Sequence, residues 1–85
     1  MGDYKLLVKR SVAKDLRAIP RKDIARILKV IEALSEEPRP PGCEKLSGQE
    51  RYRVRQGFYR IIYEIKDQEL VVYVVKVGHR REVYL

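Results

Sequence analysis

The chain has 85 residues, 45% of them apolar, so residues 1–85 are expected to form a single domain around one small core. Its longest apolar run, Leu70 to Val75, is too short to span a bilayer, and no apolar signal segment opens the sequence. Cys43 is the only cysteine and His79 the only histidine, which excludes an internal disulfide and a zinc site built from such ligands. We therefore expect a cytoplasmic protein with no membrane partner, no metal and no cofactor, in which Cys43 has no catalytic role.

The formal net charge of +7 arises from 19 basic and 12 acidic residues. It favours an anionic partner such as nucleic acid, a membrane surface or an acidic protein, although many basic domains carry such a charge for solubility alone. Residues 51–60 hold four arginines and no acid, whereas acids and bases alternate through residues 1–40 as on an ordinary solvated surface. The arginine segment is therefore the better indication of an anion site.

The N-terminal half predicts one strand and two helices. Residues 4–10 read as the strand, and Ser11 is a predicted N-cap for a short helix that ends before Pro20. Residues 21–36 predict the longer helix, because their apolar residues recur at helical spacing. This apolar stripe consists of Ile24, Ile27, Leu28, Ile31 and Leu34.

After a loop rich in proline, the apolar period changes to alternate residues, which is typical of strands. The predicted strands are residues 51–55, 58–65 and 70–77, joined by turns at Gln56-Gly57 and at Lys66-Asp67-Gln68. The last strand is apolar on both faces, as in the interior of a sheet. We expect an α+β fold of order β-α-α-β-β-β, with a small antiparallel meander sheet and both N-terminal helices on one face.

A two-residue loop at Gln56-Gly57 would set the register of the first hairpin. One sheet face then collects Tyr52, Val54, Tyr59 and Ile61, and the other collects Arg51, Arg53, Arg55, Phe58 and Arg60. In this register Arg53 and Arg60 are directly opposed, which costs stability unless an anion lies between them. A phosphate diester fits, because the guanidinium fork matches its oxygens. The alternative is that the long arginine stems splay into water at little cost.

The end of the chain adds a second basic segment, consisting of His79, Arg80, Arg81 and Tyr84. If the last strand neighbours residues 58–65, Arg80 approaches Arg60, and an arginine-lined concavity forms with an imidazole and a phenol at its rim. Two alternatives stay open, in which Tyr84 only packs near the terminus and His79 is an exposed loop residue.

Four segments closely resemble the RelE branch of the RelE/ParE toxin superfamily. They are Lys45-Leu46-Ser47-Gly48, Tyr52-Arg53-Val54-Arg55, Gly57-Phe58-Tyr59-Arg60-Ile61-Ile62-Tyr63 and Val77-Gly78-His79-Arg80-Arg81-Glu82-Val83-Tyr84. Members of that branch are toxins of type II toxin–antitoxin pairs. They cut messenger RNA in the A site of the 30S ribosomal subunit and are held inactive by a RelB-like antitoxin. The resemblance implies the same partners and a ribosome-dependent endoribonuclease (mRNA interferase) here.

The resemblance also implies roles for individual residues. The family's basic strand residues match Arg53 and Arg55, and its catalytic arginines and tyrosine match Arg60, Arg80 and Tyr84. The predicted catalytic set is Arg60, Arg80, Tyr84 and His79, and the predicted RNA-binding set is Arg51, Arg53, Arg55, Arg81 and Phe58. Nearby arginines would favour the phenolate of Tyr84, which makes it the expected base, with His79 or an arginine assisting.

Two other functions fit the same sequence. A ParE-like protein that inhibits DNA gyrase would share the fold and the antitoxin, and would need no nuclease residues. A non-catalytic RNA-binding domain would bind with a strong salt dependence and leave the RNA whole.

Overall fold

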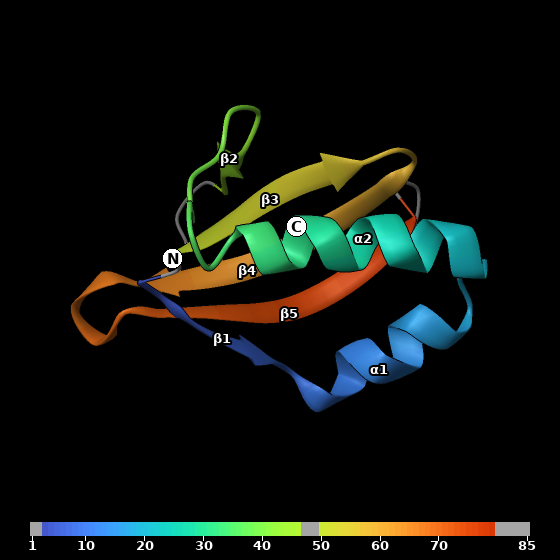
Figure 1. Cartoon of the computed structure of the whole chain (residues 1–85), viewed down its shortest axis with the longest axis horizontal. Helices are drawn as coiled ribbons and strands as arrows, with labels where there is room; N and C mark the ends of the chain where they lie inside the picture. Colours follow the sequence, from blue (N-terminus) through green and yellow to red (C-terminus); the bar gives the residue numbers. More distant parts are fainter. Residues whose placement is uncertain (1–2, 47–49, 80–85) are drawn as a thin grey trace.

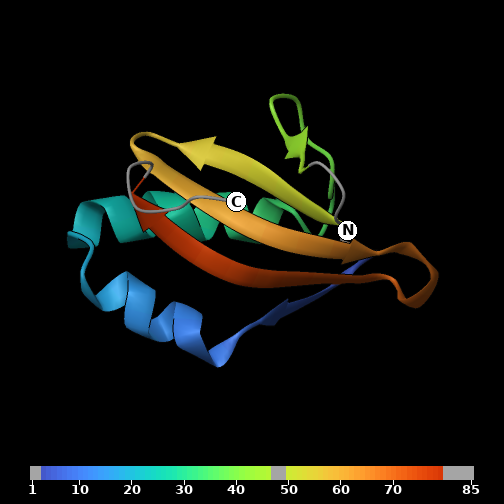
Figure 2. The same ribbon diagram turned by 180° about the vertical axis from the view of Figure 1, so that it is seen from behind.

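The computed structural model describes residues 3–46 and 50–79, which form two helices and a five-stranded mixed sheet (Figure 1). The elements in chain order are β1 (Lys5–Val8), α1 (Arg10–Arg17), α2 (Arg21–Ala33), β2 (Glu44–Lys45), β3 (Arg51–Gln56), β4 (Tyr59–Lys66), the 3-10 helix η1 (Asp67–Glu69) and β5 (Val71–His79). Both helices cover the same face of the sheet, as the view from behind also shows (Figure 2). The predicted fold class is confirmed.

The strand order is β1-β5-β4-β3-β2. β3, β4 and β5 form the expected antiparallel meander, and β1 pairs with β5 in parallel. β5 therefore lies inside the sheet, which explains why it is apolar on both faces. The additional strand β2 was not predicted, because two residues are too few to show an alternating pattern.

The core lies between the helices and the sheet. Val12 of α1 and Ile27 of α2 are fully buried, and they pack in one cluster with the sheet residues Ile61, Tyr63 and Val74. Burying these side chains is the main force that holds the helices on the sheet. No helix in the two described ranges is long and apolar enough to cross a membrane.

Three details of the helices differ from the prediction. α1 begins at Arg10 with Lys9 as its N-cap, so the proposed Ser11 cap is wrong. α2 ends at Ala33, before the expected Glu36. Leu28 is 41% exposed, because it lies roughly 90° around the helix from the centre of the buried stripe. The buried stripe of α2 is therefore narrower than the sequence indicated.

Candidate functional site

The side of the sheet opposite the helices carries four arginines, and we call it the arginine face. Its members are Arg51, Arg53 and Arg55 of β3 and Arg60 of β4. Their neighbours along the strands point into the helix-covered core, and side chains alternate between faces along a strand. The predicted assignment of these arginines to one face is therefore correct.

The arginines that oppose each other are not the expected pair. The hairpin loop is Gly57-Phe58, one residue later than predicted, with Gly57 at φ +60°. The pairing consequently shifts by two positions, so each residue keeps its face but changes its partner. Arg60 opposes Arg55 on β3, whereas the predicted Arg53–Arg60 pair is wrong.

Two glutamates share this face and reduce its charge. Arg51 Nε donates to Glu64 at 3.0 Å, and Arg53 binds Glu44 of β2 at 2.7 Å. Glu44 also lies 4.0 Å from the guanidinium of Arg55. The sequence analysis missed both acids, because they come from other segments, β2 and the far half of β4. Arg51 and Arg53 are thus bound by acids of the chain, and Arg55 and Arg60 are directly opposed across the hairpin.

His79 lies at the same end of the sheet as Arg60 but on the other face. It opposes Tyr59, whose ring contacts the helix-side core, while Arg60 opposes Gly78. The His79 ring stacks on Phe58 at 6.2 Å between centroids and meets the edge of Tyr59 at 5.9 Å. His79 is therefore the half-buried last residue of β5, so its reading as an exposed loop residue is wrong.

Phe58 lies in the hairpin loop, where its side chain is 63% exposed. Its predicted place on the arginine face is wrong, because the loop lies one residue later than expected and the ring turns to His79 and the α2 side. A hollow of about 230 Å³ adjoins Phe58 and His79 and is also lined by Gln56 and by Asp23 and Arg26 of α2. An exposed aromatic ring beside polar groups is a suitable surface for stacking a nucleobase. The predicted residues Arg80, Arg81 and Tyr84 lie outside the described residues.

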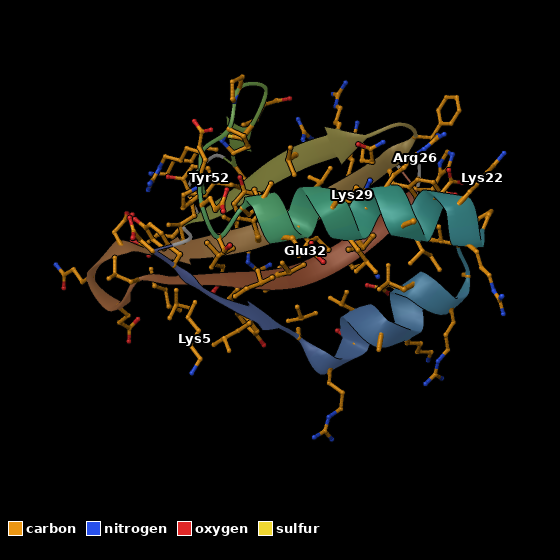
Figure 3. The ribbon with its side chains drawn as sticks, viewed as in Figure 1. Lys5, Lys22, Arg26, Lys29, Glu32 and Tyr52 are labelled. Atoms are coloured by element: carbon orange, nitrogen blue, oxygen red, sulfur yellow. The ribbon has the colours of Figure 1, made fainter. Side chains whose placement is uncertain are left out.

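A second basic surface covers the helices. Eight bases lie in residues 9–29, all of them exposed, against only two acids. The bases are Lys9, Arg10, Lys14, Arg17, Arg21, Lys22, Arg26 and Lys29. Lys22, Arg26 and Lys29 follow one another along α2 (Figure 3). The expectation of evenly alternating charges in residues 1–40 is therefore wrong for this segment.

Two of the described tyrosines are poorly suited to act as a base. Burial raises the pKa of Tyr63, and its hydroxyl donates to the carbonyl of Pro38 at 2.7 Å. The hydrogen bond that Tyr4 donates to Asp67 raises the pKa of the Tyr4 hydroxyl. Both residues hold the fold at the end of the sheet that is remote from Arg60. Within residues 3–46 and 50–79, no group of His, Cys, Asp and Glu side chains is placed to hold a metal.

The fold belongs to a known class of toxins. The protein-family model described as "ParE toxin of type II toxin-antitoxin system, parDE" matches residues 6–84. The chain therefore belongs to this family of toxins.

Individual relatives identify the branch. Toxin RelG of Mycobacterium tuberculosis is 28% identical over 85 residues, which cover 95% of each chain. The RelE–RelB complex of Pyrococcus horikoshii OT3 matches with a TM-score of 0.83 at 29% identity, covering 95% of this chain and 99% of that chain. The intact Escherichia coli RelBE toxin–antitoxin complex matches with a TM-score of 0.76 at 26% identity, covering 89% and 95%. The protein is a RelE-branch toxin of a toxin–antitoxin system, as the four sequence segments indicated.

Proposed function

We propose that this toxin is a ribosome-dependent mRNA interferase, which cleaves messenger RNA in the A site and so inhibits translation. The observation that carries the proposal is the direct opposition of Arg55 and Arg60 at one end of the arginine face. Two opposed guanidinium groups repel each other, and a phosphate between them would relieve that repulsion. A RelE-branch toxin would use such a site on the RNA backbone.

RNA supplies its own nucleophile, the 2′-hydroxyl, which also distinguishes it from DNA. Placing this oxygen in line with the neighbouring phosphorus can contribute up to roughly 7–11 kcal/mol. The transition state carries additional negative charge on the phosphate oxygens. Arg60 and Arg80 are the residues proposed to stabilise it, at about 3–4 kcal/mol per well-placed donor.

The 2′-proton needs a base and the leaving 5′-oxygen needs an acid. We assign the base to Tyr84, with His79 assisting. Phe58 is the residue proposed to stack on a base that is turned out of the message, because its ring is exposed beside His79. Arg51, Arg53, Arg55 and Arg81 are the residues proposed to bind the backbone.

The basic helical surface supports the ribosome as the place of action. Its eight exposed cations lie on α1, on α2 and at Lys9 beside α1, whereas the arginine face lies on the opposite side of the sheet, so the molecule offers two basic surfaces. Ribosomal RNA around the A site would provide phosphates for the second surface. A RelB-like antitoxin is the proposed natural inhibitor, since similar toxins have been solved as RelE–RelB complexes.

The test is incubation with 70S ribosomes that hold a defined codon in the A site, followed by analysis of the RNA ends. We expect a 2′,3′-cyclic phosphate or 3′-phosphate product, little cleavage of free RNA, and loss of activity when the antitoxin is added. Intact messages after prolonged incubation with folded protein would contradict the proposal.

Inhibition of DNA gyrase is the second candidate, because the matching family model is described as a ParE toxin. A supercoiling assay run beside the ribosome assay separates the two. Inhibition of supercoiling without RNA cleavage would favour the gyrase function.

A further inference from the structure

The end of β5 extends beyond its neighbour β1. β1 ends at Val8, which pairs with Val74, and the chain then leaves the sheet to form α1. β5 continues to His79, still paired with β4 on its other side. Over residues 75–79 the β1 side of β5 has no strand beside it in the described part of the chain. A buried backbone N–H on that side needs another acceptor.

Asp15 of α1 provides that acceptor. Its Oδ2 accepts a hydrogen bond from the backbone N–H of Val77 at 3.2 Å, and its Oδ1 accepts one from Lys76 Nζ at 3.0 Å. The Asp15 side chain is only 14% exposed, and Val77 is 1% exposed. One carboxylate thus takes the place of the missing strand at Val77 and also binds the side chain of the preceding Lys76.

The helix that carries Asp15 is itself firmly held. Val12 of α1 is fully buried, and Leu16 packs against the same core. Asp15 lies between them in the sequence and in a groove of about 580 Å³ that separates α1 from the end of β5. The carboxylate therefore fixes the end of β5 relative to a firmly packed helix.

That strand end leads directly into the proposed site. Gly78, which follows Val77, opposes Arg60, and His79 comes next. We propose that Asp15 is a positioning residue, whose carboxylate holds the end of β5 so that Gly78 stays beside Arg60 and His79 stays against Phe58. This inference rests on the proposed function. Asp15 would touch no substrate and would act only through β5.

Three variants separate the contacts of Asp15. Asp15→Ala removes both hydrogen bonds, Asp15→Asn keeps an oxygen that can accept from Val77, and Lys76→Met removes only the ammonium group. Glu32→Gln on α2 is the control for loss of an exposed carboxylate from the helical layer (Figure 3). Ile31→Val, a buried α2 change, is the control for lost stability.

In single-turnover cleavage on programmed ribosomes, we expect Asp15→Ala to reduce the maximal rate about 10-fold to 100-fold, because a displacement of about 1 Å can cost that much. The ribosome concentration that gives half the maximal rate should stay unchanged. Asp15→Asn should restore most of the rate, and Lys76→Met and both controls should stay near wild type. Amide exchange at Val77 should accelerate in Asp15→Ala and not in Asp15→Asn.

Two results would overturn the inference. One is a wild-type cleavage rate for Asp15→Ala. The other is an equal loss of cleavage rate in Asp15→Ala and in Ile31→Val, which would mean that Asp15 contributes only to stability. If the wild-type protein cleaves no message, the proposed function fails, and the same variants are scored by growth arrest on expression. Weakened arrest in Asp15→Ala with recovery in Asp15→Asn would then support the positioning role, and equal arrest in all variants would reject it.

Discussion

The two ends of the sheet use arginine in opposite ways. At the η1 end, Arg39 donates two hydrogen bonds to Asp67, at 3.1 and 2.9 Å, and one to the Tyr52 hydroxyl at 3.2 Å. At the other end, Arg55 and Arg60 face each other across β3 and β4. The first arginine is paired with an acid of opposite charge, whereas the second pair places two like charges at directly opposed positions. Under the proposed function, the first end maintains the fold and the second end binds a phosphate of the message.

The largest expected effect separates the two ends directly. Arg60→Ala should reduce single-turnover cleavage on ribosomes about 100-fold to 1,000-fold, because under the proposed function it removes a donor to the transition state. Arg39→Ala is the matched control and should keep the wild-type rate. Circular dichroism should show that both variants fold. The distinction between the ends fails if the Arg39 variant loses as much activity as the Arg60 variant.

A second variant tests whether the η1 end serves stability. Tyr63→Phe leaves the Pro38 carbonyl without its buried donor, so we expect the free energy of unfolding to fall by about 1–3 kcal/mol. Urea unfolding measures this change. Tyr52→Phe, which alters a more exposed hydroxyl, should have a smaller effect. A lower cleavage rate per folded molecule of Tyr63→Phe would show that the two ends are not independent.

A smaller effect is expected from removing an acid on the arginine face. Glu44→Gln releases Arg53 and Arg55, so single-stranded RNA should bind more tightly, with the salt slope steeper by about 0.7 for each additional phosphate that the protein neutralises. Fluorescence anisotropy at several salt concentrations measures both quantities. Glu69→Gln in η1 makes the same charge change at the other end. Equal tightening in the two variants would mean that net charge, and not the arginine face, controls binding.

The smallest effect concerns pH. Hydrogen bonds from Arg39 and then Tyr4 lower the pKa of Asp67 from 3.8 to about 2. The folded pKa is below the ordinary value, so Asp67 contributes stability above pH about 4 and loses it as the pH falls through about 2. The melting temperatures of wild type and Asp67→Asn should therefore differ near neutral pH and converge in acid. A difference that grows in acid would contradict this sign.

Much of the architecture follows from local patterns. Helical and alternating periods predicted α1, α2 and the meander, and alternation alone placed Arg51, Arg53, Arg55 and Arg60 on one face. That assignment remained correct despite an error in the hairpin loop, because moving the loop by one residue shifts the pairing by two and preserves the faces. Periodicity determines which face a side chain occupies, whatever its partner.

The partners themselves depend on tertiary structure. The position of the loop decided that Arg55, and not Arg53, opposes Arg60. Glu44 reaches the arginine face only because β2 adds to the edge of the sheet, and Asp15 reaches Val77 across 62 positions of sequence. Local periodicity and motifs were enough to establish the fold class, the toxin family and the arginine face. Packing between segments that are distant in the sequence decided which charged side chains pair. A local sequence pattern contains no information about that packing.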